Sequence, residues 1–372
     1  MAKRSTLLLL IPHLGGGGAE RVIELLARNL PQELYALHLG LITQVKVGTI
    51  QLPSHVAVHA LGAHRARYAV VPLFRLIRQV QPDLILSGMV HANFLLLSLR
   101  PFLSRRARIL VRQSGTASEM LQSHALPRWA STAYRRLYCR ADGIICQSQA
   151  MADDLVRCAG VSHELLHVLP NPVDIHPTRL DCNGTRFWHG PGPHLFAAGR
   201  LSREKGFDLL LHAFARVRAL WRTADLTIAG TGREEQALRQ LCGSLGLKDS
   251  VHFLGHVDAP AEYYFGASLF VLPSRQEGIP NALLEAAAGG LPIVATPASV
   301  GLVKLVGAQP GIWLADGVSA EALTKALMAA FAQRPGERFC HRWVEPFALK
   351  NAIPAWVQLI DSTLEKAPLC LA

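Results

Sequence analysis

Two glutamates, Glu277 and Glu285, flank the segment "EGIPNALLE" and are the first candidates for chemistry. Pro280 between them is favourable near the first position of a helix, so a helix should begin there. A carboxylate accepts two hydrogen bonds at once, so one glutamate could hold a sugar diol and the other a ribose. The alternative, a dipole-favoured Glu277 and a solvent-facing Glu285, fits poorly with the apolar run "ALLEAAAGG". The backbone N–H groups of the first turn should be unpaired and able to bind phosphate: those of Asn281, Ala282 and Leu283.

Two cations, Arg200 and Lys205, lie in "GRLSREKGFD" directly after the apolar run "FAAG". A departing nucleoside diphosphate gains negative charge in the transition state, and fixed positive charges stabilise it. Surface charge alone would explain Arg203 and Glu204, but it explains Arg200 poorly. We therefore expect Arg200 and Lys205 to bind a diphosphate.

A third segment, "GGGGAER" (Gly15–Arg21), places glycines between an apolar run and a helical pattern. Glycines let the backbone approach an anion, and the following helix offers free N–H groups. The spacing is neither that of a phosphate-binding P-loop nor G-x-G-x-x-G, so a flexible turn is the alternative.

These segments lie between elements that alternate along the chain. Short apolar runs such as "TLLLLIPH" and "PDLILSG" alternate with helix-period segments, which predicts an α/β fold with parallel, doubly wound sheets. The Pro- and Gly-rich stretch 169–194 interrupts the alternation, which then restarts. We predict two Rossmann-like domains with a ligand cleft between them: a first domain at 1–180, a linker at 181–193 and a second domain at 194–340.

The charge is unevenly distributed between the two halves. Residues 1–180 hold 20 Lys and Arg against 10 Asp and Glu, whereas the remaining residues hold 18 against 17, for a net charge of +11. A basic first half suggests an anionic partner such as nucleic acid, phospholipid or a phosphorylated acceptor.

The seven scattered cysteines favour a reducing compartment. The apolar run near the N-terminus is better explained as a strand than as a signal peptide, and no membrane span is expected.

The set of motifs resembles the GT-B retaining glycosyltransferases of glycosyltransferase family 4. The E-x7-E motif is present as Glu277 and Glu285, and further matches are "GGAER", "NPVD" (Asn171–Asp174), "LTIAGTGREEQAL" and "VHFLGHV". The resemblance covers most of the chain and is densest from about 196 to 296. The resemblance implies that the domain at 1–180 is the acceptor side and the domain at 194–340 is the nucleotide-sugar donor domain. It also implies that the C-terminal segment 341–372 crosses back to the first domain as a helix.

The resemblance implies roles for individual residues. Glu277 would hold the transferred sugar and Glu285 the ribose, while Arg200 and Lys205 would hold the donor diphosphate. A histidine of the first domain would contact the transferred sugar; His91 in "GMVHAN" matches best, with His13 as the rival. The loop at 297–307 departs from the family pattern, because it carries Lys304 and no acid. The remaining donor-binding positions implied are Gly17, Gly18, Val257 with the backbone around it, Gly278, Asn281, Ala282 and Leu283.

Two basic segments of the first half mix arginines with apolar residues, as an interfacial helix does: "NFLLLSLRPFLSRRAR" and "RWASTAYRRLYCR". Core packing explains Phe94–Leu97 equally well. We expect a cytoplasmic protein attached peripherally to the inner membrane leaflet, with an acceptor linked to polyprenyl diphosphate or lipopolysaccharide. The arginines assigned to this surface are Arg105, Arg106, Arg108, Arg135, Arg136 and Arg140.

The leading hypothesis is thus an enzyme that moves a hexose or N-acetylhexosamine from a nucleotide diphosphate sugar, with UDP as the family's usual nucleotide. No cofactor or metal is expected, since the chain has no Asp-x-Asp and helix ends with Arg200 and Lys205 can carry the phosphate charge. A GT-B nucleotide-sugar epimerase is the second reading. The sequence lacks the recognition motifs expected of a nucleic-acid-binding protein. It also lacks the glycine fingerprint expected of a nicotinamide oxidoreductase.

Overall fold

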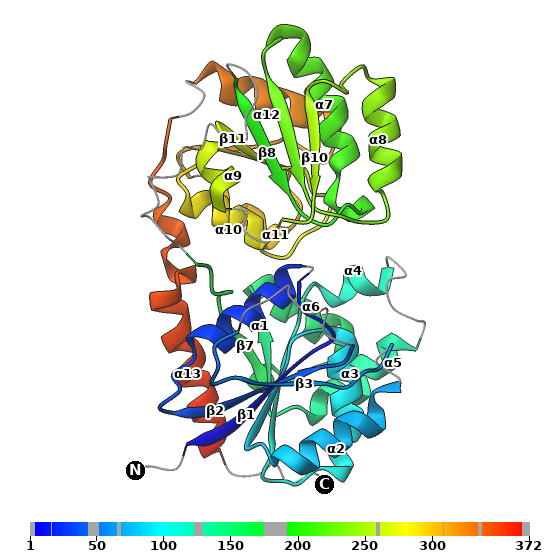
Figure 1. The fold of residues 1–372 in the computed structure, drawn as a ribbon, viewed down its shortest axis with the longest axis vertical. Coiled ribbons are helices and arrows are strands. Elements are labelled where there is room, and N and C mark those ends of the chain that lie inside the picture. The colour runs from blue at the N-terminus through cyan, green and yellow to red at the C-terminus, as the bar shows by residue number, and fades with distance from the viewer. Residues whose placement is uncertain are drawn as a thin grey trace. The chain divides into compact units, whose positions relative to one another are not determined.

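A computed structural model of the chain describes residues 4–15, 17–43, 52–64, 68–122, 129–174, 192–257, 261–307, 309–333 and 337–366. The chain divides into two units, drawn in Figure 1. Unit 1 comprises Met1–Pro172 with Leu349–Ala372, and unit 2 comprises Val173–Ala348. Each unit is a parallel sheet with helices on both faces, as the sequence predicts.

The sheet of unit 1 has seven parallel strands in the order β3-β2-β1-β4-β5-β6-β7. Its central strands are continuous apolar runs, because helices cover both of their faces. The switch in strand order lies between β1 and β4, which is where α/β sheets of this kind bind ligands. The strands are β1 (Ser5–Ile11), β2 (Tyr35–Leu41), β3 (Ala57–Ala60), β4 (Leu84–Ser87), β5 (Arg108–Arg112), β6 (Gly143–Cys146) and β7 (Leu166–Val168).

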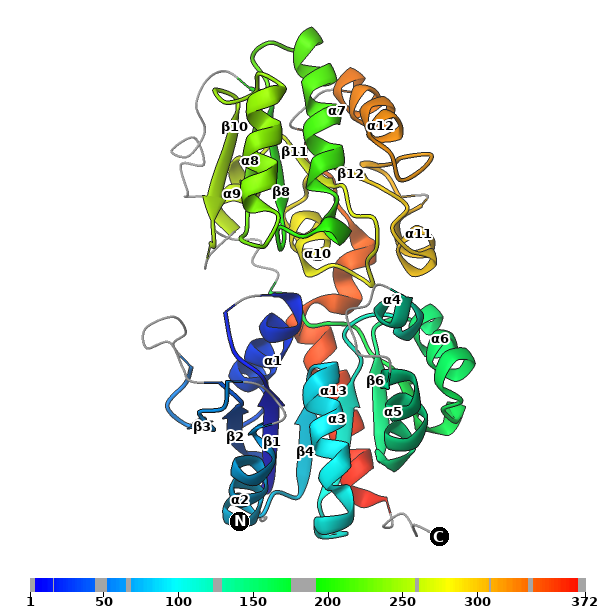
Figure 2. The same ribbon diagram turned by 90° about the vertical axis from the view of Figure 1, so that its right-hand side faces the viewer.

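Helices α1 and α13 pack on one face of this sheet, and α2, α3, α5 and α6 on the other (Figure 2). On the α13 side, the indole of Trp356 is fully buried and donates a hydrogen bond to the carbonyl of Pro170 (3.0 Å). The last helix therefore belongs to unit 1. The helices are α1 (Gly18–Asn29), α2 (Val70–Val80), α3 (Val90–Leu99), α4 (Ala117–Gln122), α5 (Ala130–Leu137), α6 (Gln149–Ala159) and α13 (Leu349–Glu365).

The sheet of unit 2 has six parallel strands in the order β10-β9-β8-β11-β12-β13. The strands are β8 (His194–Ala198), β9 (Asp225–Ala229), β10 (Val251–Gly255), β11 (Leu269–Leu272), β12 (Ile293–Ala295) and β13 (Ile312–Leu314). The helices are α7 (Phe207–Leu220), α8 (Glu235–Ser244), α9 (Ala261–Gly266), α10 (Asn281–Ala288), α11 (Val300–Val306) and α12 (Ala320–Ala332).

The unit boundaries fall at Pro172 and Ala348, whereas the sequence places domain limits at 180 and 340. The predicted linker at 181–193, apart from Gly192 and Pro193, lies outside the described residues, so its extent stays a prediction. None of the helices in the described ranges is long and apolar enough to cross a bilayer.

Candidate active site

Glu277 lies in the loop between β11 and α10, where it meets a cation from another loop. Its carboxylate forms an ion pair with the ammonium of Lys205 and accepts a hydrogen bond from the Ser274 hydroxyl (2.9 Å). The two charged side chains are 9% and 25% exposed, respectively, so the pair is largely shielded from water but not sealed. The structure thus brings together the acid predicted to hold the sugar and a cation predicted to hold the diphosphate.

A second ion pair fixes the same two loops to each other. The guanidinium of Arg275 meets both oxygens of the Asp208 carboxylate at 2.6 Å, and it also donates to the carbonyl of Arg203 (2.9 Å). The backbone N–H of Arg275 donates to the carbonyl of Glu204 (2.7 Å). Burial raises the pKa of Asp208, but the hydrogen bonds and charge of Arg275, together with backbone hydrogen bonds, outweigh it and leave that pKa lowered. Two-point contact of this kind sets distance and orientation together, so it holds Lys205 and Glu277 in register.

Sequence reasoning did not single out this Arg275–Asp208 pair. Asp208 is the last residue of "GRLSREKGFD", and Arg275 directly precedes "QEG". Opposite charges 67 residues apart give no periodic signal, and only the fold brings them together.

Glu285, one turn inside α10, is half-buried and accepts a hydrogen bond from the Tyr264 hydroxyl (3.0 Å). Tyr264 is itself buried, and burial together with the nearby Glu285 charge raises its pKa well above the usual value. The phenol therefore remains a hydrogen-bond donor at any working pH. It occupies one acceptor position of Glu285 and leaves the carboxylate oriented, so the reading of Glu285 as a freely solvated residue is excluded.

The first turn of α10 differs in part from the prediction. Pro280 is the residue before the helix and Asn281 its first residue. The N–H of Leu283 was expected to be unpaired, but it donates to the carbonyl of Pro280 (3.1 Å) because the first turn is tightened to an i→i+3 bond. That expectation was wrong. The N–H of Ala282 has no acceptor within the described part of the chain, and Gly278 accepts from the Ser299 hydroxyl (3.3 Å).

Two glycines allow the loops of unit 2 to lie in contact. Gly206, at the end of the Lys205 loop, has a φ of +65°, and a Cβ there would lie 2.0 Å from the carbonyl oxygen of Pro273. Gly230, after β9, has a φ of +137°, and its Cβ would lie 1.9 Å from the carbonyl oxygen of Gly199. Because glycine has no side chain, the loop carrying Lys205 can approach Pro273, which lies before Glu277, and Gly230 can approach Gly199.

Arg200, the other predicted phosphate ligand, is exposed, and its side chain makes no ion pair within the described residues. Near the predicted base site, the carbonyl of Gly255 accepts from the N–H of Gly230 (2.7 Å), and Val257 is half-buried.

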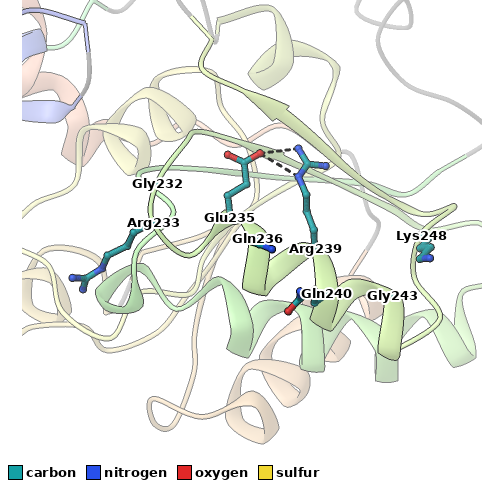
Figure 3. Close-up of a pocket in the computed structure, with 8 residues that line it drawn as sticks. All are labelled: Gly232, Arg233, Glu235, Gln236, Arg239, Gln240, Gly243 and Lys248. Carbon is teal, nitrogen blue, oxygen red and sulfur yellow. Dashed lines mark hydrogen bonds and ion pairs between the residues drawn. The ribbon is translucent and has the colours of Figure 1, made fainter.

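A shallow pocket of about 750 Å³ lies along α8 (Figure 3). Within it Glu235 and Arg239 form an ion pair (2.9 Å), and the Arg239 guanidinium lies over the Phe253 ring, 4.7 Å from its centroid. None of the predicted donor residues lines it, so this pocket is separate from the Glu277–Lys205 pair. Its lining residues are Gly232, Arg233, Glu235, Gln236, Arg239, Gln240, Gly243 and Lys248.

In unit 1 the candidate groups lie at the carboxyl ends of the strands. His91 is the second residue of α3, four positions after the end of β4, and its side chain is exposed, with no hydrogen bond or ion pair in the described ranges. Its rival His13 lies 3.4 Å from the buried carboxylate of Glu20. Gly17 precedes α1 and Gly18 begins it, so the glycine loop leads into a helix N-terminus as expected.

Arg108 corrects the predicted basic surface. It lies in β5, is only 5% exposed and forms an ion pair with Asp142 (3.3 Å). A strand at the centre of a sheet has no solvent face, so this arginine is a structural cation and its assignment to the acceptor surface was wrong. Arg105, Arg106, Arg135 and Arg136 are exposed, and Arg140 is half-buried.

The apolar residues of the two basic segments are mostly internal. Phe94–Leu97 are buried in the core under α3, which decides between the two readings in favour of core packing. Tyr134 and Tyr138 are fully buried, so the α5 segment is not an interfacial helix with an aromatic face. Among the large apolar residues of these segments, Phe102 and Trp129 are exposed, at 71% and 59%.

Comparison with known proteins agrees with this architecture. The model described as Glycosyltransferase Family 4 matches residues 16–176, and the model described as Glycosyl transferases group 1 matches residues 192–333. An uncharacterized glycosyltransferase of Haemophilus influenzae is 35% identical over 133 residues, 36% of this chain and 38% of the relative. An uncharacterized glycosyltransferase of Methanocaldococcus jannaschii is 25% identical over 62% of this chain and 59% of the relative. The chain thus spans about two fifths to three fifths of the length of these two relatives.

A Campylobacter jejuni protein named N-acetylgalactosamine-N,N'-diacetylbacillosaminyl-diphospho-undecaprenol 4-alpha-N-acetylgalactosaminyltransferase is 25% identical, over 80% of this chain and 82% of the relative. Among solved structures, a sucrose-phosphate synthase from Thermosynechococcus elongatus superposes with a TM-score of 0.83 at 18% identity, over 96% of this chain and 99% of that one. Anabaena Alr3699/HepE in complex with UDP and glucose superposes with a TM-score of 0.76 at 20% identity, over 96% and 99%.

The two family models together cover most of the chain in the order of its two units, and the structural neighbours share its fold. The chain belongs to the glycosyltransferases of family 4 and group 1, with the GT-B fold.

Proposed function

We propose that the protein is a retaining glycosyltransferase that moves a hexose or N-acetylhexosamine from a nucleotide diphosphate sugar, preferably a UDP-sugar. The observation that carries this proposal is the Lys205–Glu277 ion pair. Eight residues after Glu277, Glu285 is oriented by a hydrogen bond from Tyr264. One unit thereby holds a cation suited to phosphate and two acids suited to diols, on loops fixed by the Arg275–Asp208 pair. A UDP complex of the similarly folded HepE supports the choice of nucleotide.

In this proposal Lys205 and the exposed Arg200 bind the donor diphosphate, with the N-terminus of α10 adding backbone donors around Gly278, Asn281 and Ala282. Glu285 binds the ribose, and the backbone near Val257 meets the base. In the structure, Glu277 forms an ion pair with the ammonium of Lys205. Donor binding would exchange that contact for phosphate and release Glu277 to the sugar hydroxyls.

The reaction would proceed on one face of the sugar. The bond between the anomeric carbon and the phosphate oxygen breaks, and the acceptor hydroxyl forms a new bond to the same carbon from the same side. The acceptor's proton passes to the departing phosphate oxygen, so no enzymic nucleophile is required. Lys205 and Arg200 stabilise the charge that develops on the diphosphate, and this takes the place of a metal ion. Glycine-loop residues Gly17 and Gly18 and the exposed His91 are the proposed contributions of unit 1.

The acceptor we propose is a glycan linked to polyprenyl diphosphate or to lipopolysaccharide. The Campylobacter relative is named for a diphospho-undecaprenol substrate, and a Rhizobium meliloti relative, 28% identical over 46% of this chain, is named a lipopolysaccharide core biosynthesis glycosyltransferase. The exposed arginines Arg105, Arg106, Arg135 and Arg136 suit an anionic membrane surface at the inner leaflet.

The test is a panel of UDP-, GDP- and ADP-sugars, assayed by thermal shift and by donor hydrolysis without acceptor. We expect a UDP-sugar to stabilise the protein and to be hydrolysed slowly. Release of an epimerised donor, with no glycosylated product when acceptors are supplied, would instead identify a nucleotide-sugar epimerase. Membrane attachment is tested with anionic vesicles; if the wild type sediments with them no more than a variant lacking the four exposed arginines, that part of the proposal fails.

A further inference from the structure

One exposed aromatic side chain, Trp129, stands at the start of α5 in unit 1. It is 59% exposed. Exposed Thr132 and Arg136 follow three and seven positions later, which places them on the same face of the helix. The face therefore offers one flat apolar ring with polar groups below it. A pyranose ring has the complementary pattern, with an apolar C–H face and a rim of hydroxyls.

The ring is held by a rigid support. Phe94 of α3 packs against Trp129 with 6.0 Å between centroids, and against Tyr134 edge-to-face at 5.0 Å. Gln113 then ties the hydroxyls of both buried tyrosines, donating to Tyr134 (3.0 Å) and accepting from Tyr138 (2.8 Å). An aromatic ring fixed in this way loses little freedom when a ligand stacks on it, so the surface is prepared for binding.

The position of Trp129 along the helices places it near the candidate catalytic histidine. Helices α3 and α5 lie side by side and both run away from the carboxyl ends of the strands, as Figure 2 shows. Phe94 of α3 contacts both Trp129 and Tyr134. His91 precedes Phe94 by three residues, about 4.5 Å along the axis of α3. Trp129 precedes Tyr134, at the level of Phe94, by five residues, about 7.5 Å. His91 and Trp129 therefore both lie on the carboxyl-end side of Phe94.

A membrane is the competing ligand for an exposed tryptophan beside arginines. The described surroundings of Trp129 do not favour it, because Tyr134, Tyr138 and Phe94 are internal and, among the residues that the structure describes, they add no apolar surface around the indole. Phe102, in the 3₁₀ turn Arg100–Phe102 at the opposite end of α3, is also an exposed aromatic residue, at 71%. It is the natural matched control.

We propose that Trp129 is an acceptor-binding residue: its indole stacks on the apolar face of an acceptor pyranose and so holds the attacking hydroxyl near His91. This inference rests on the proposed transferase function and adds the acceptor subsite to it. The subsite takes a sugar ring, and the ring's link to lipid or to further sugars lies outside it.

The experiment compares Trp129→Ala, Trp129→Phe and Phe102→Ala with the wild type, using octyl glycosides of glucose, galactose, N-acetylglucosamine and N-acetylgalactosamine as acceptors. Trp129→Ala should raise the KM for the accepted glycoside about tenfold while the donor KM and the acceptor-free hydrolysis of the donor stay unchanged. Trp129→Phe should recover most of the loss, and Phe102→Ala should match the wild type. Equal acceptor KM values in Trp129→Ala and the wild type would overturn the proposal, as would loss of vesicle binding in Trp129→Ala without any change in acceptor KM.

A failure of the proposed function gives a different result. If the wild type glycosylates none of the four glycosides, their binding is measured directly by calorimetry in the presence of UDP. Weaker binding by Trp129→Ala than by Phe102→Ala would support the sugar subsite independently of transfer. Equal binding by both variants, or no binding by the wild type, would overturn it.

Discussion

The loops of unit 2 and the strand ends of unit 1 arrange their functional groups in opposite ways. In unit 2 two pairs of charged side chains are matched with one another: Lys205 with Glu277, and Arg275 with Asp208. In unit 1 the candidate ligand-binding residues His91 and Trp129 are exposed, and neither contacts a charged side chain in the described ranges. Some buried charges of unit 1, such as Arg108 and Asp142, are paired inside the core instead.

The difference indicates how each unit orients the groups that would bind a ligand. A site for a diphosphate and two diols needs several polar groups at fixed distances, and mutual ion pairs hold them before the ligand arrives. A site for an acceptor ring needs one flat surface and one nearby polar group. Rigid packing beneath the surface is sufficient for that, and the aromatic support under Trp129 provides it.

The largest expected effect comes from Glu277→Gln, which removes the charge and keeps the shape. Transfer should fall about a thousandfold, because the contact to the transferred sugar is lost when charge develops. UDP affinity should hold or rise, since Lys205 is released from its partner. Activity assays and calorimetry separate the two effects. Glu321→Gln, at a highly exposed glutamate, is the control, and an equal loss of transfer and UDP affinity in Glu277→Gln would contradict the assigned role.

The next effect concerns the close approach of the two loops in unit 2. Gly206→Ala should lower the free energy of unfolding by about 3 kcal/mol and weaken UDP binding at least tenfold, because the new Cβ meets the Pro273 carbonyl. Gly246→Ala has a similar φ of +69° but nothing within 4 Å of the Cβ, so it should cost only about 1 kcal/mol. Urea unfolding and calorimetry measure both. Equal losses in the two variants would show that backbone strain, and not contact, is decisive.

Arg108→Met tests the buried charges of unit 1. The free energy of unfolding should fall by about 3 kcal/mol, since the Asp142 carboxylate loses one of its two cationic partners and keeps only Arg100. Arg105→Gln, at an exposed position, should change stability by less than about 0.5 kcal/mol. Urea denaturation of both variants decides the matter. A small loss for Arg108→Met, with a loss of vesicle binding, would restore the surface role that the sequence suggested.

Tyr264→Phe should have a smaller, local effect. Removing the hydroxyl takes away the Tyr264 hydrogen bond to Glu285, and UDP should bind about fivefold more weakly, the equivalent of roughly 1 kcal/mol. The acceptor KM should not change, and the effect should be the same across neutral and mildly alkaline pH because the raised pKa keeps the phenol protonated. An unchanged UDP affinity would remove Tyr264 from the donor site.

The smallest effect is the pH dependence contributed by Asp208. Its lowered pKa means that its contribution to stability is complete above the pKa of the unfolded chain, near 4, and is lost as the pH falls through the folded value. The side chain is 42% exposed, so the contribution should be only about 0.5 kcal/mol. Unfolding of the wild type and Asp208→Asn at pH 7 and pH 3 measures it. The variant should be less stable at pH 7 and nearly equal at pH 3; an equal difference at both values would exclude the ionic contribution.

The sequence determined the fold class, the strand and helix order, and the loops that carry the candidate groups. Apolar runs and helix-period segments are local patterns, and alternation along the chain suffices to predict parallel sheets. The sequence also singled out the candidate residues Glu277, Glu285, Arg200 and Lys205, because a motif with fixed spacing is visible without coordinates.

Only the tertiary structure decided what each charge meets. Arg108 and Arg105 are three positions apart in one basic run, yet one is buried beside Asp142 and the other is exposed. The Arg275–Asp208 and Tyr264–Glu285 contacts join residues 67 and 21 positions apart, and Trp129 is supported by Phe94 from another helix. Burial and pairing depend on which elements the chain brings together over such separations. A local pattern reports the type of a residue and its helix or strand, whereas its partner depends on packing.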